Sequence, residues 1–242
     1  MGVFWFNLYY WPLFLLVTAL GVVVCPLLFL VDQLRGRQRT PAATLRHLIR
    51  LYGWLLVVAV PFWQPVRLVN KGAKLPVPVI FVPNHTSAID PFVFGALAME
   101  NAFVTSWPFK IPGYSFFMRQ AGYVDVRKGW PEVARGVEKL LGQGCSVIMW
   151  PEGHRTRTGK MGRFRRGAFE VAVRSNTPIV PVCIKGTRRV LPAGKIFLRP
   201  GRVTLTLLPP VYPQKGLPLQ EQVASLRDTV RTMIAEELAR SA

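Results

Sequence analysis

The sequence predicts an α/β fold, a largely parallel sheet covered by helices and preceded by an N-terminal helical segment embedded in a membrane. From residue 77 onward, apolar runs rich in valine and isoleucine alternate with amphipathic stretches. Strands and helices in alternation form parallel sheets that are covered on both faces. Before residue 64 the chain is instead predominantly apolar. We therefore divide the chain into membrane-associated helices (1–63) and an α/β domain (64–242).

The strands and helices of the domain are expected at definite places. Apolar runs predict strands at 77–82, 122–126, 145–150, 178–184 and 203–208. The stretches between them predict helices at 91–100, 131–142 and 164–175. A last helix is predicted over 218–240, because apolar residues recur there at spacings of three and four along one face.

The N-terminal region has the composition of a membrane element. Residues 3–31 carry no charge, and a helix of about 20 residues already spans the hydrocarbon core. This run is expected either to cross the membrane or to lie in one leaflet. A second apolar run, 51–63, is shorter and suits a helix that enters only the near leaflet. A core helical hairpin of a soluble protein is the alternative.

Arginines at positions 35, 37, 39, 46 and 50 form a basic loop between the two runs. Basic residues also follow the second run. Because positively charged loops stay in the cytoplasm, both segments are expected on that side. The sequence thus predicts a bacterial-type inner membrane protein with its α/β domain on the cytoplasmic face.

The net charge and the cysteines narrow the classes of partner. The formal net charge is +19, from 31 Lys and Arg against 12 Asp and Glu. Such a surface attracts nucleic acid, anionic lipids or phosphorylated substrates. Beside an apolar N-terminus, anionic membrane lipids are favoured and nucleic acid is not. The three cysteines form no CxxC pattern, so neither a zinc site nor a disulfide framework is predicted.

The stretch "VPNHTSAIDPF" (82–92) places His85 directly after a predicted strand and Asp90 five residues later. On one continuous helix these side chains would point about 140° apart, so they meet only if the chain turns between them. An aspartate bonded to one imidazole nitrogen would leave the other as a general base. With no serine or cysteine nearby as a nucleophile, the pair suits activation of a substrate hydroxyl. A capping aspartate beside a solvated histidine is the alternative.

A second stretch, "WPEGHRTRTGKMGRFRRG" (150–167), also follows an apolar run. Its glycines let the backbone approach a ligand closely, and the planar fork of arginine binds phosphate in bidentate fashion. A functional role is favoured for Glu152 and Arg155, which lie directly at the strand end. The more distal arginines suit a solvated basic loop at a membrane surface equally well.

Two further stretches end predicted strands. One is "AGYVDVRKG" (121–129), which contains Arg127, and the other is "PIVPVCIKG" (178–186), in which Pro181 interrupts an apolar run. Within sheets, proline is confined to edges and bulges. Either stretch alone would be ordinary structure. Because the carboxyl ends of strands in an open α/β sheet border one crevice, all four stretches are expected to meet at one pocket.

Taken in order, these blocks resemble the glycerolipid acyltransferases typified by 1-acyl-sn-glycerol-3-phosphate acyltransferase. The matching residues are "NHTSAIDP", "GYVDVRK", "WPEGHRTRTG" and "IVPVCIKG", and the resemblance covers about residues 64 to 210. It implies transfer of a fatty acyl group from acyl-CoA or acyl-carrier protein to the sn-2 hydroxyl of a lysophosphatidate acceptor. The product would be phosphatidic acid, in phospholipid biosynthesis. Neither a cofactor nor a metal is implied.

The resemblance also implies a role for each matched residue. His85 would be the general base and Asp90 would orient it, and the acyl group would pass to the acceptor without an acyl-enzyme. Pro181 matches the block that is associated with the acyl donor. The positions that bind the acceptor, chiefly its phosphate, are matched by Arg127, Glu152, Gly153 and Arg155.

The sequence departs from the family pattern in three places. His154 stands where the family usually has Thr or Ser, as a neutral substitution or as an added contact to phosphate or base. Asp125 shifts the register of the second block. Lys110 precedes Ile-Pro as in many members, but Ser106 and Trp107 replace the frequent Lys-Glu pair upstream. These differences leave the acceptor open.

Two other functions therefore remain. One keeps the chemistry and changes the acceptor to another lysophospholipid or a lyso-aminolipid. The other is a non-catalytic protein that binds anionic lipid at a membrane surface. The presence of both His85 and Asp90 argues against the second, because a binding module has no use for the pair.

Overall fold

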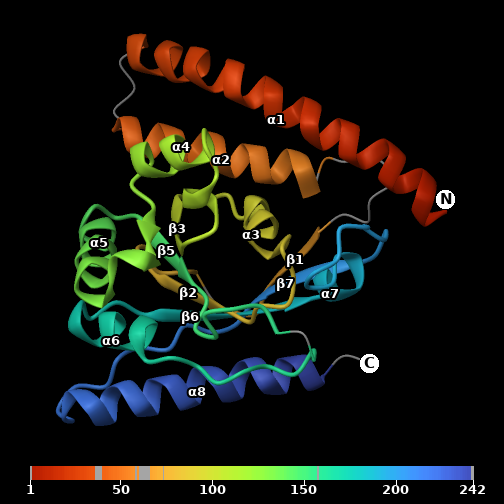
Figure 1. The fold of residues 1–242 in the computed structure, drawn as a ribbon. Helices are drawn as coiled ribbons and strands as arrows, with labels where there is room; N and C mark the ends of the chain where they lie inside the picture. The colour runs from red at the N-terminus through yellow and green to blue at the C-terminus, as the bar shows by residue number, and fades with distance from the viewer. Residues whose placement is uncertain are drawn as a thin grey trace.

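The computed structural model describes residues 2–35, 40–57, 59, 66–72, 74–156 and 158–240. In this part of the chain a seven-stranded sheet has the order β1-β7-β6-β2-β5-β3-β4 (Figure 1). Its strands are β1 (Val66–Asn70), β2 (Ile80–Pro83), β3 (Asn101–Thr105), β4 (Val124–Asp125), β5 (Ser146–Met149), β6 (Ile179–Lys185) and β7 (Val203–Leu207). Neighbouring strands are parallel except β6 and β7, which are antiparallel. The predicted α/β class is confirmed.

Two strands were not predicted from the sequence, and one predicted helix is too long. β1 is an edge strand with exposed positions, so its sequence lacks the continuous apolar run of a buried strand. The helix predicted over 91–100 is two short pieces, α3 (Asp90–Val93) and η1 (Phe94–Ala96), followed at once by β3. Periodicity cannot distinguish a short buried helix from a short buried strand, which explains this error.

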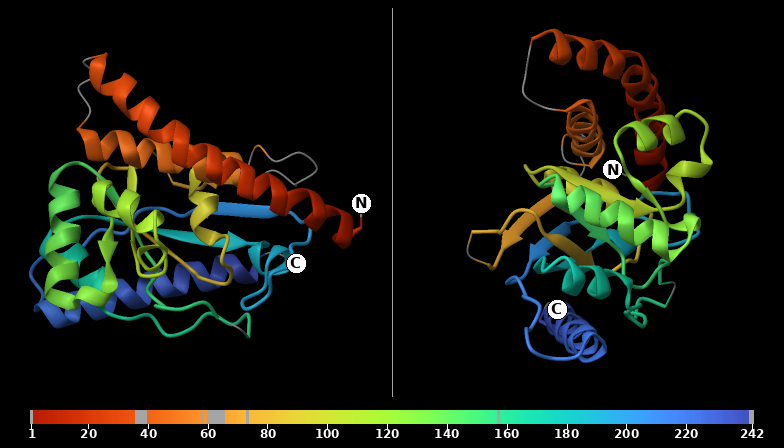
Figure 2. Two further views of the ribbon diagram at one scale, coloured as in Figure 1. Left: turned by 45° about the horizontal axis from the view of Figure 1, so that its top comes forward. Right: turned by 90° about the vertical axis from the view of Figure 1, so that its left-hand side faces the viewer.

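Helices cover both faces of the sheet and create two apolar cores (Figure 2). Those that share one core are α5 (Trp130–Gly142), α6 (Gly167–Arg174) and α8 (Leu219–Ala239). The other core contains residues of α3, α7 (Thr187–Val190) and the start of α1 (Val3–Leu34). Successive side chains of β2 point to opposite faces of the sheet, so Ile80 and Val82 lie in the first core and Phe81 lies in the second.

The helix α1 has both of its ends attached to the same body. Among the described residues it is the one helix long and apolar enough to cross a membrane. Near its start, Phe6 and Tyr10 are buried in the second core. Near its end, Asp32 accepts a hydrogen bond of 2.6 Å from the Thr44 hydroxyl of α2 (Pro41–Val57). The apolar side chains between these points are largely exposed.

The position of helix α2 shows that the predicted basic loop and the predicted bounds of the short apolar helix are partly wrong. It begins at Pro41 and ends at Val57 within the described chain, so Arg46 and Arg50 lie on a helix and not in a loop. Arg46 is only 3% exposed, because its guanidinium bonds to Glu100 at 2.7 Å and to the Ala121 carbonyl at 2.8 Å. These two arginines therefore anchor α2 on the domain. Part of the predicted loop (36–39) and part of the second apolar run (58 and 60–63) lie outside the described residues.

A chain of hydroxyl groups joins α1 and α2 to a third helix, α4 (Tyr114–Gln120). The Tyr52 hydroxyl lies 2.8 Å from the Thr18 hydroxyl and 2.7 Å from that of Tyr114. Two short 3₁₀ helices, η2 (Pro108–Lys110) and η3 (Val126–Lys128), complete the connections. Because α2 contacts α1, α3 and η1, the N-terminal helices pack directly on the α/β domain. The domain boundary at residue 63 stays a prediction.

The contact between η1 and α2 depends on a glycine. A Cβ at Gly95 would lie 2.7 Å from the Gly53 carbonyl carbon and 2.9 Å from the Trp54 Cα, and these backbone atoms cannot rotate away. We expect Gly95→Ala to lower the free energy of unfolding by about 1–3 kcal/mol, the usual cost of overpacking. Thermal or denaturant unfolding measures this change.

Gly142→Ala is the matched control, since a Cβ at Gly142 meets nothing within 4 Å. Because alanine is the better helix former by about 1 kcal/mol, this variant is expected to be neutral or slightly stabilised. Equal unfolding free energies for the two variants would contradict the proposed close contact.

Candidate active site

His85 and Asp90 meet at the carboxyl end of β2. The imidazole Nδ1 lies 2.8 Å from Asp90 Oδ2. The same oxygen accepts the backbone N–H groups of Thr86 at 2.8 Å and Ser87 at 2.9 Å, and Asp90 is fully buried. The turn that the five-residue spacing requires is therefore present, and the carboxylate itself holds it. With Nδ1 donating to Asp90, the Nε2 lone pair remains for a substrate.

Aromatic rings pack against the imidazole of His85. The ring centroid of Trp150 lies 5.0 Å from that of His85, at an interplanar angle of 35°. Trp150 in turn stacks on Phe103 at 5.7 Å and meets Phe94 edge-on at 6.1 Å. The sequence prediction assigned no role to Trp150. Trp150 directly follows β5, which neighbours β2 in the sheet, and this position could have indicated that it lies beside His85.

Glu152 bonds to backbone groups and does not line the cavity described below. Its Oε1 accepts the His85 N–H at 2.8 Å, and its Oε2 accepts the Gly162 N–H at 2.7 Å. The Thr156 N–H also donates to the His85 carbonyl at 2.9 Å. Glu152 is buried, so any contribution to acceptor binding would act through these backbone contacts. It links the arginine-rich segment to the backbone of His85.

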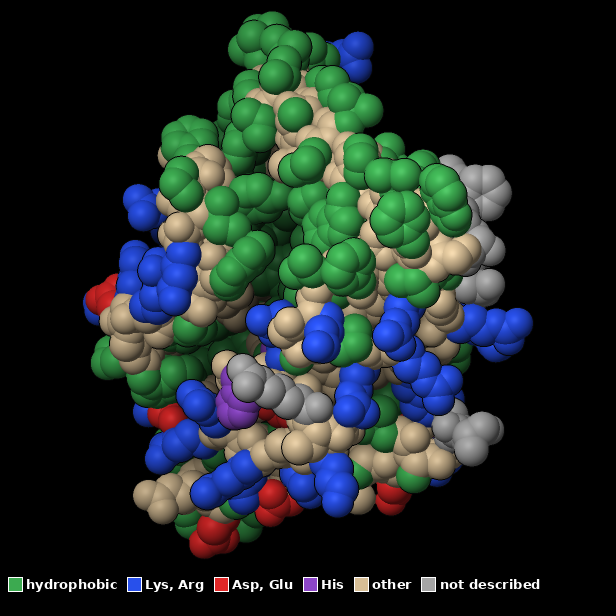
Figure 3. Space-filling view, turned by 45° about the vertical axis from the view of Figure 1, so that its right-hand side comes forward, with side chains coloured by type: hydrophobic (Ala, Val, Ile, Leu, Met, Phe, Trp, Pro, Cys, Tyr) green, Lys and Arg blue, Asp and Glu red, His purple; other side chains and the backbone are tan. Residues whose placement is uncertain are grey.

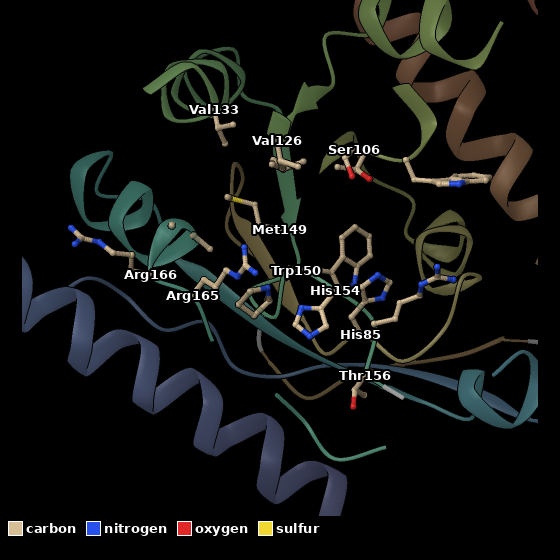
Figure 4. Close-up of a pocket in the computed structure, with 18 of the residues that line it drawn as sticks. His85, Ser106, Val126, Val133, Met149, Trp150, His154, Thr156, Arg165 and Arg166 are labelled. Carbon is tan, nitrogen blue, oxygen red and sulfur yellow. The ribbon is translucent and has the colours of Figure 1, made fainter. Parts of the chain in front are cut away.

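A cavity of about 1310 Å³ opens beside these groups (Figure 4). Its polar part is bordered by His85, His154 and Arg165. Val126, Val133 and Met149 form an apolar wall, and Figure 4 shows them on the far side of Trp150 from His85. One cavity therefore joins a candidate base, basic side chains and an apolar wall.

The glycine and arginines of the basic segment have distinct environments. Gly153 has a φ of +74°, and a Cβ there would lie 2.9 Å from the Arg165 guanidinium carbon, so only glycine lets that side chain lie against the turn. Arg166 is paired with Glu170 at 3.0 Å. Within the described chain Arg155 lines the cavity, is exposed and forms no ion pair. Arg165 shares these three properties, so among the described arginines of this segment both Arg155 and Arg165 can bind an anion in the cavity.

The structure does not bring every expected residue to the cavity. Arg127 lies outside it and donates to Asp125, with Nη2 to Oδ2 at 2.6 Å, and this guanidinium lowers the pKa of the Asp125 carboxyl. Its neighbour Val126 lines the cavity instead. Lys110 is exposed at the end of η2 and does not line the cavity. The roles expected for Arg127 and Lys110 stay predictions.

Pro181 is also absent from the cavity lining. It is buried within β6, a central strand, and pairs in register with Val82 of β2. Of the two expected positions for this proline, the sheet edge is wrong. A bulge is present, because Val182 pairs with Leu207 and Ile179 with Val211, which leaves two residues of β6 opposite three of the partner segment. The register between β6 and β7 begins one residue later, at Val182, and the Pro181 carbonyl accepts the Leu208 N–H at 2.9 Å. Its expected association with the acyl donor stays a prediction.

Residues 67–185, which include the candidate base and the arginine-rich segment, match the model of the Acyltransferase family. The chain carries an acyltransferase-family domain. This domain contains β1 to β6 and the site described above.

Known proteins are similar to the acyltransferase domain and its flanks. A 1-acyl-sn-glycerol-3-phosphate acyltransferase of Chlamydomonas reinhardtii is 30% identical over 194 residues, which cover 76% of this chain and 56% of the relative. The alpha form from Ovis aries is 29% identical over 238 residues, covering 91% and 74%. A chloroplastic relative from Brassica napus is 27% identical, covering 76% and 54%. The chain thus spans about half the length of the first and third of these relatives.

The fold has a solved counterpart. The crystal structure of the 1-acyl-sn-glycerophosphate (LPA) acyltransferase PlsC from Thermotoga maritima matches the whole of both chains, with a TM-score of 0.74 and 24% sequence identity. At this identity the match establishes the shared fold.

The double contact of Glu152 is open to test. Glutamine has one acceptor oxygen, so in Glu152→Gln either the His85 or the Gly162 N–H would face an amide NH₂ group. Leaving a buried donor without a partner costs about 1–3 kcal/mol. We expect a loss of that size in the free energy of unfolding, and faster hydrogen exchange at the Gly162 or the His85 amide.

Glu132→Gln is the matched control, since Glu132 pairs with Arg135 on an exposed face of α5. Such surface pairs contribute about 0–1 kcal/mol. If exchange at both Gly162 and His85 is the same in Glu152→Gln as in the unmodified protein, Glu152 does not join the basic segment to His85.

Proposed function

We propose that this protein transfers a fatty acyl group from acyl-CoA or acyl-carrier protein to the sn-2 hydroxyl of 1-acyl-glycerol-3-phosphate, giving phosphatidic acid. The observation that carries the proposal is His85, held at Nδ1 by a buried carboxylate and facing a cavity with unpaired arginine. The names of the relatives point to the same acceptor.

The proposed reaction requires one base and no covalent enzyme intermediate. His85 Nε2 accepts the proton of the acceptor hydroxyl while the hydroxyl oxygen bonds to the thioester carbonyl carbon. Asp90 stabilises the imidazolium that forms. The tetrahedral intermediate then loses the thiolate as the C–S bond breaks, and His85 returns the proton to the sulfur. The histidine is thereby ready for another cycle.

The cavity offers separate environments for the two ends of the acceptor. Arg155 is positioned to bind the phosphate in bidentate fashion, and Arg165 adds positive charge beside it. His154 is an additional contact in the same region. The apolar wall of Val126, Val133 and Met149 suits acyl chains. A volume of about 1310 Å³ exceeds that of ordinary small-molecule sites, as a lipid and a thioester together require.

The proposed location is the cytoplasmic face of a bacterial-type inner membrane. An α1 that spanned the bilayer would separate its two ends by the hydrocarbon core of about 30 Å. Instead, Phe6 and Asp32 both contact the body that contains the catalytic cavity. We therefore place α1 in one leaflet, with its exposed apolar side chains in lipid, as in other interfacial helices.

The role of His85 is tested by His85→Ala. Because general-base catalysis contributes about 10²–10⁴-fold, kcat for acyl transfer from a labelled donor is expected to fall by that factor. Association with vesicles should not change, since His85 lies in the cavity away from α1. Full activity in this variant would refute the assignment.

Ser106→Ala is the matched control, because Ser106 lines the same cavity. Figure 4 shows Trp150 between Ser106 and His85. Direct transfer does not use this hydroxyl, so the variant should stay active. A folded but inactive Ser106→Ala protein would favour an acyl-enzyme instead.

Arg155→Ala tests the phosphate contact. A hydrogen bond to a charged group contributes about 1.5–3 kcal/mol, so the KM for the acceptor should rise roughly 10- to 100-fold, with a much smaller change in the KM for the donor. Arg135→Ala, on the exposed face of α5, should change neither constant. An unchanged acceptor KM in Arg155→Ala would remove this residue from the binding site.

One screen distinguishes the acceptors and donors. The purified protein would be incubated with labelled acyl-CoA or acyl-carrier protein and, in turn, lysophosphatidate, other lysophospholipids and a lyso-aminolipid. Acylation of lysophosphatidate at the highest kcat/KM supports the proposal. Preference for another acceptor would keep the chemistry and change the substrate, and transfer to none of them would favour a lipid-binding protein.

A further inference from the structure

The segment Pro192–Pro200, between α7 and β7, is here named the rim loop. Ala193 and Gly194, near its start, line the catalytic cavity. The rim loop is also attached to the turn that holds the candidate base, because Ser87 forms an isolated bridge with Pro192, and the Ser87 hydroxyl donates to the carbonyl of the preceding Leu191 at 2.7 Å. Its start is therefore fixed beside the site.

The far end of the rim loop is fixed to α1. Leu198 is buried in the core, and its N–H donates to Asn7 Oδ1 at 2.8 Å. The Asn7 amide returns a bond of 2.8 Å to the Leu198 carbonyl. The Asn7 amide thus bonds to both backbone groups of Leu198, as a paired residue of a neighbouring strand does. The Arg199 N–H further donates to the Val190 carbonyl at 2.8 Å.

Between these attachments the rim loop exposes two adjacent apolar side chains, Ile196 (69% exposed) and Phe197 (59%). Exposed apolar residues that occur singly are ordinary. The Asn7–Leu198 pair joins the rim loop to the start of α1, where Phe4 (67%) and Trp5 (63%) are also exposed. Exposed apolar side chains therefore occur on both of the segments that this pair joins.

The charge around this surface is positive. Between Glu170 and Glu221 the sequence contains no Asp or Glu. Lys195 and Arg199 flank the apolar tip and are exposed. Figure 3 shows apolar side chains over the upper part of this face, with Lys and Arg gathered below them. Apolar groups beside a basic rim complement an anionic lipid bilayer, in which acyl chains lie beneath negative head groups.

We propose that the rim loop is a second membrane-insertion element, separate from α1. Ile196 and Phe197 enter the lipid, while Lys195 and Arg199 contact anionic head groups. Since Ala193 and Gly194 line the cavity, this insertion holds the cavity mouth at the membrane surface. The proposal extends the proposed function, because it states where a lipid acceptor leaves the bilayer to reach His85.

The insertion can be measured without any assay of acyl transfer. A nitrobenzoxadiazole label at Phe197→Cys would be examined on vesicles of phosphatidylglycerol and phosphatidylcholine, in a Cys25→Ala background. Cys145 and Cys183 would not react, because burial raises the pKa of each thiol to about 12. We expect a blue shift on the vesicles, and quenching by lipids that carry doxyl groups on the acyl chain.

Two further labels are controls for this measurement. Leu16→Cys on α1 should be quenched, and Tyr212→Cys, equally exposed but outside the surface, should remain in water. A label at position 197 that stays in water while the one at position 16 is quenched would overturn the proposal. A blue shift that appears without vesicles as the protein is concentrated would assign the tip to contact between copies, and would also overturn it.

The functional consequence is tested with Ile196→Ser/Phe197→Ser against Tyr212→Ser. Partition onto anionic vesicles should weaken roughly ten-fold or more in the double variant, because each lost apolar group reduces burial in lipid. Activity toward lysophosphatidate in vesicles should fall with it, and activity toward a monomeric short-chain acceptor should not. Unchanged partition of the double variant would refute the proposal. If instead the unmodified protein acylates no acceptor while the label at Phe197→Cys still enters the lipid, the proposed function alone is refuted.

Discussion

The buried carboxylate of Asp90 is the constraint on which the candidate site depends. A single oxygen, Oδ2, receives the imidazole of His85 and the backbone N–H groups of Thr86 and Ser87. The carboxylate thereby fixes the path of the turn and the orientation of the base in one arrangement. Removing it would leave buried donors without a partner, which costs far more than one ordinary hydrogen bond contributes. The turn in turn positions Ser87, and through Ser87 it positions the start of the rim loop.

Acidic side chains in this protein act mainly as internal connectors. The buried ones are Asp90, Asp125, Glu152, Glu170 and Glu237. Glu152 joins the basic segment to His85, and Glu237 of α8 pairs with Lys71 at 2.6 Å. Because so many of the 12 acids are used inside, the exterior is more basic than the net charge of +19 alone indicates. This distribution suits a protein that works against anionic lipid and holds an anionic substrate.

Much of the fold and part of the site could be predicted from local pattern. Buried strands such as β5 and β6 are continuous apolar runs, and α8 shows its spacing of three and four, so both were recognised. The meeting of His85 and Asp90 followed from the turn between them. The edge strand β1 and the role of Glu152 were not recognised, because partly exposed strands lack a distinctive pattern and the partners of Glu152 are backbone groups of other segments.

The sequence by itself determined the α/β class, the position of the candidate base beside a strand end and the apolar N-terminus, since each is encoded within a few neighbouring residues. Only the tertiary structure decided which distant residues the buried polar side chains bond to. Arg46 is buried against Glu100, and Asn7 pairs with Leu198 across almost the whole chain. Such contacts join residues that are far apart in the sequence, and each buried polar group needs a hydrogen-bond partner once water is removed. For that reason no local pattern could have assigned them.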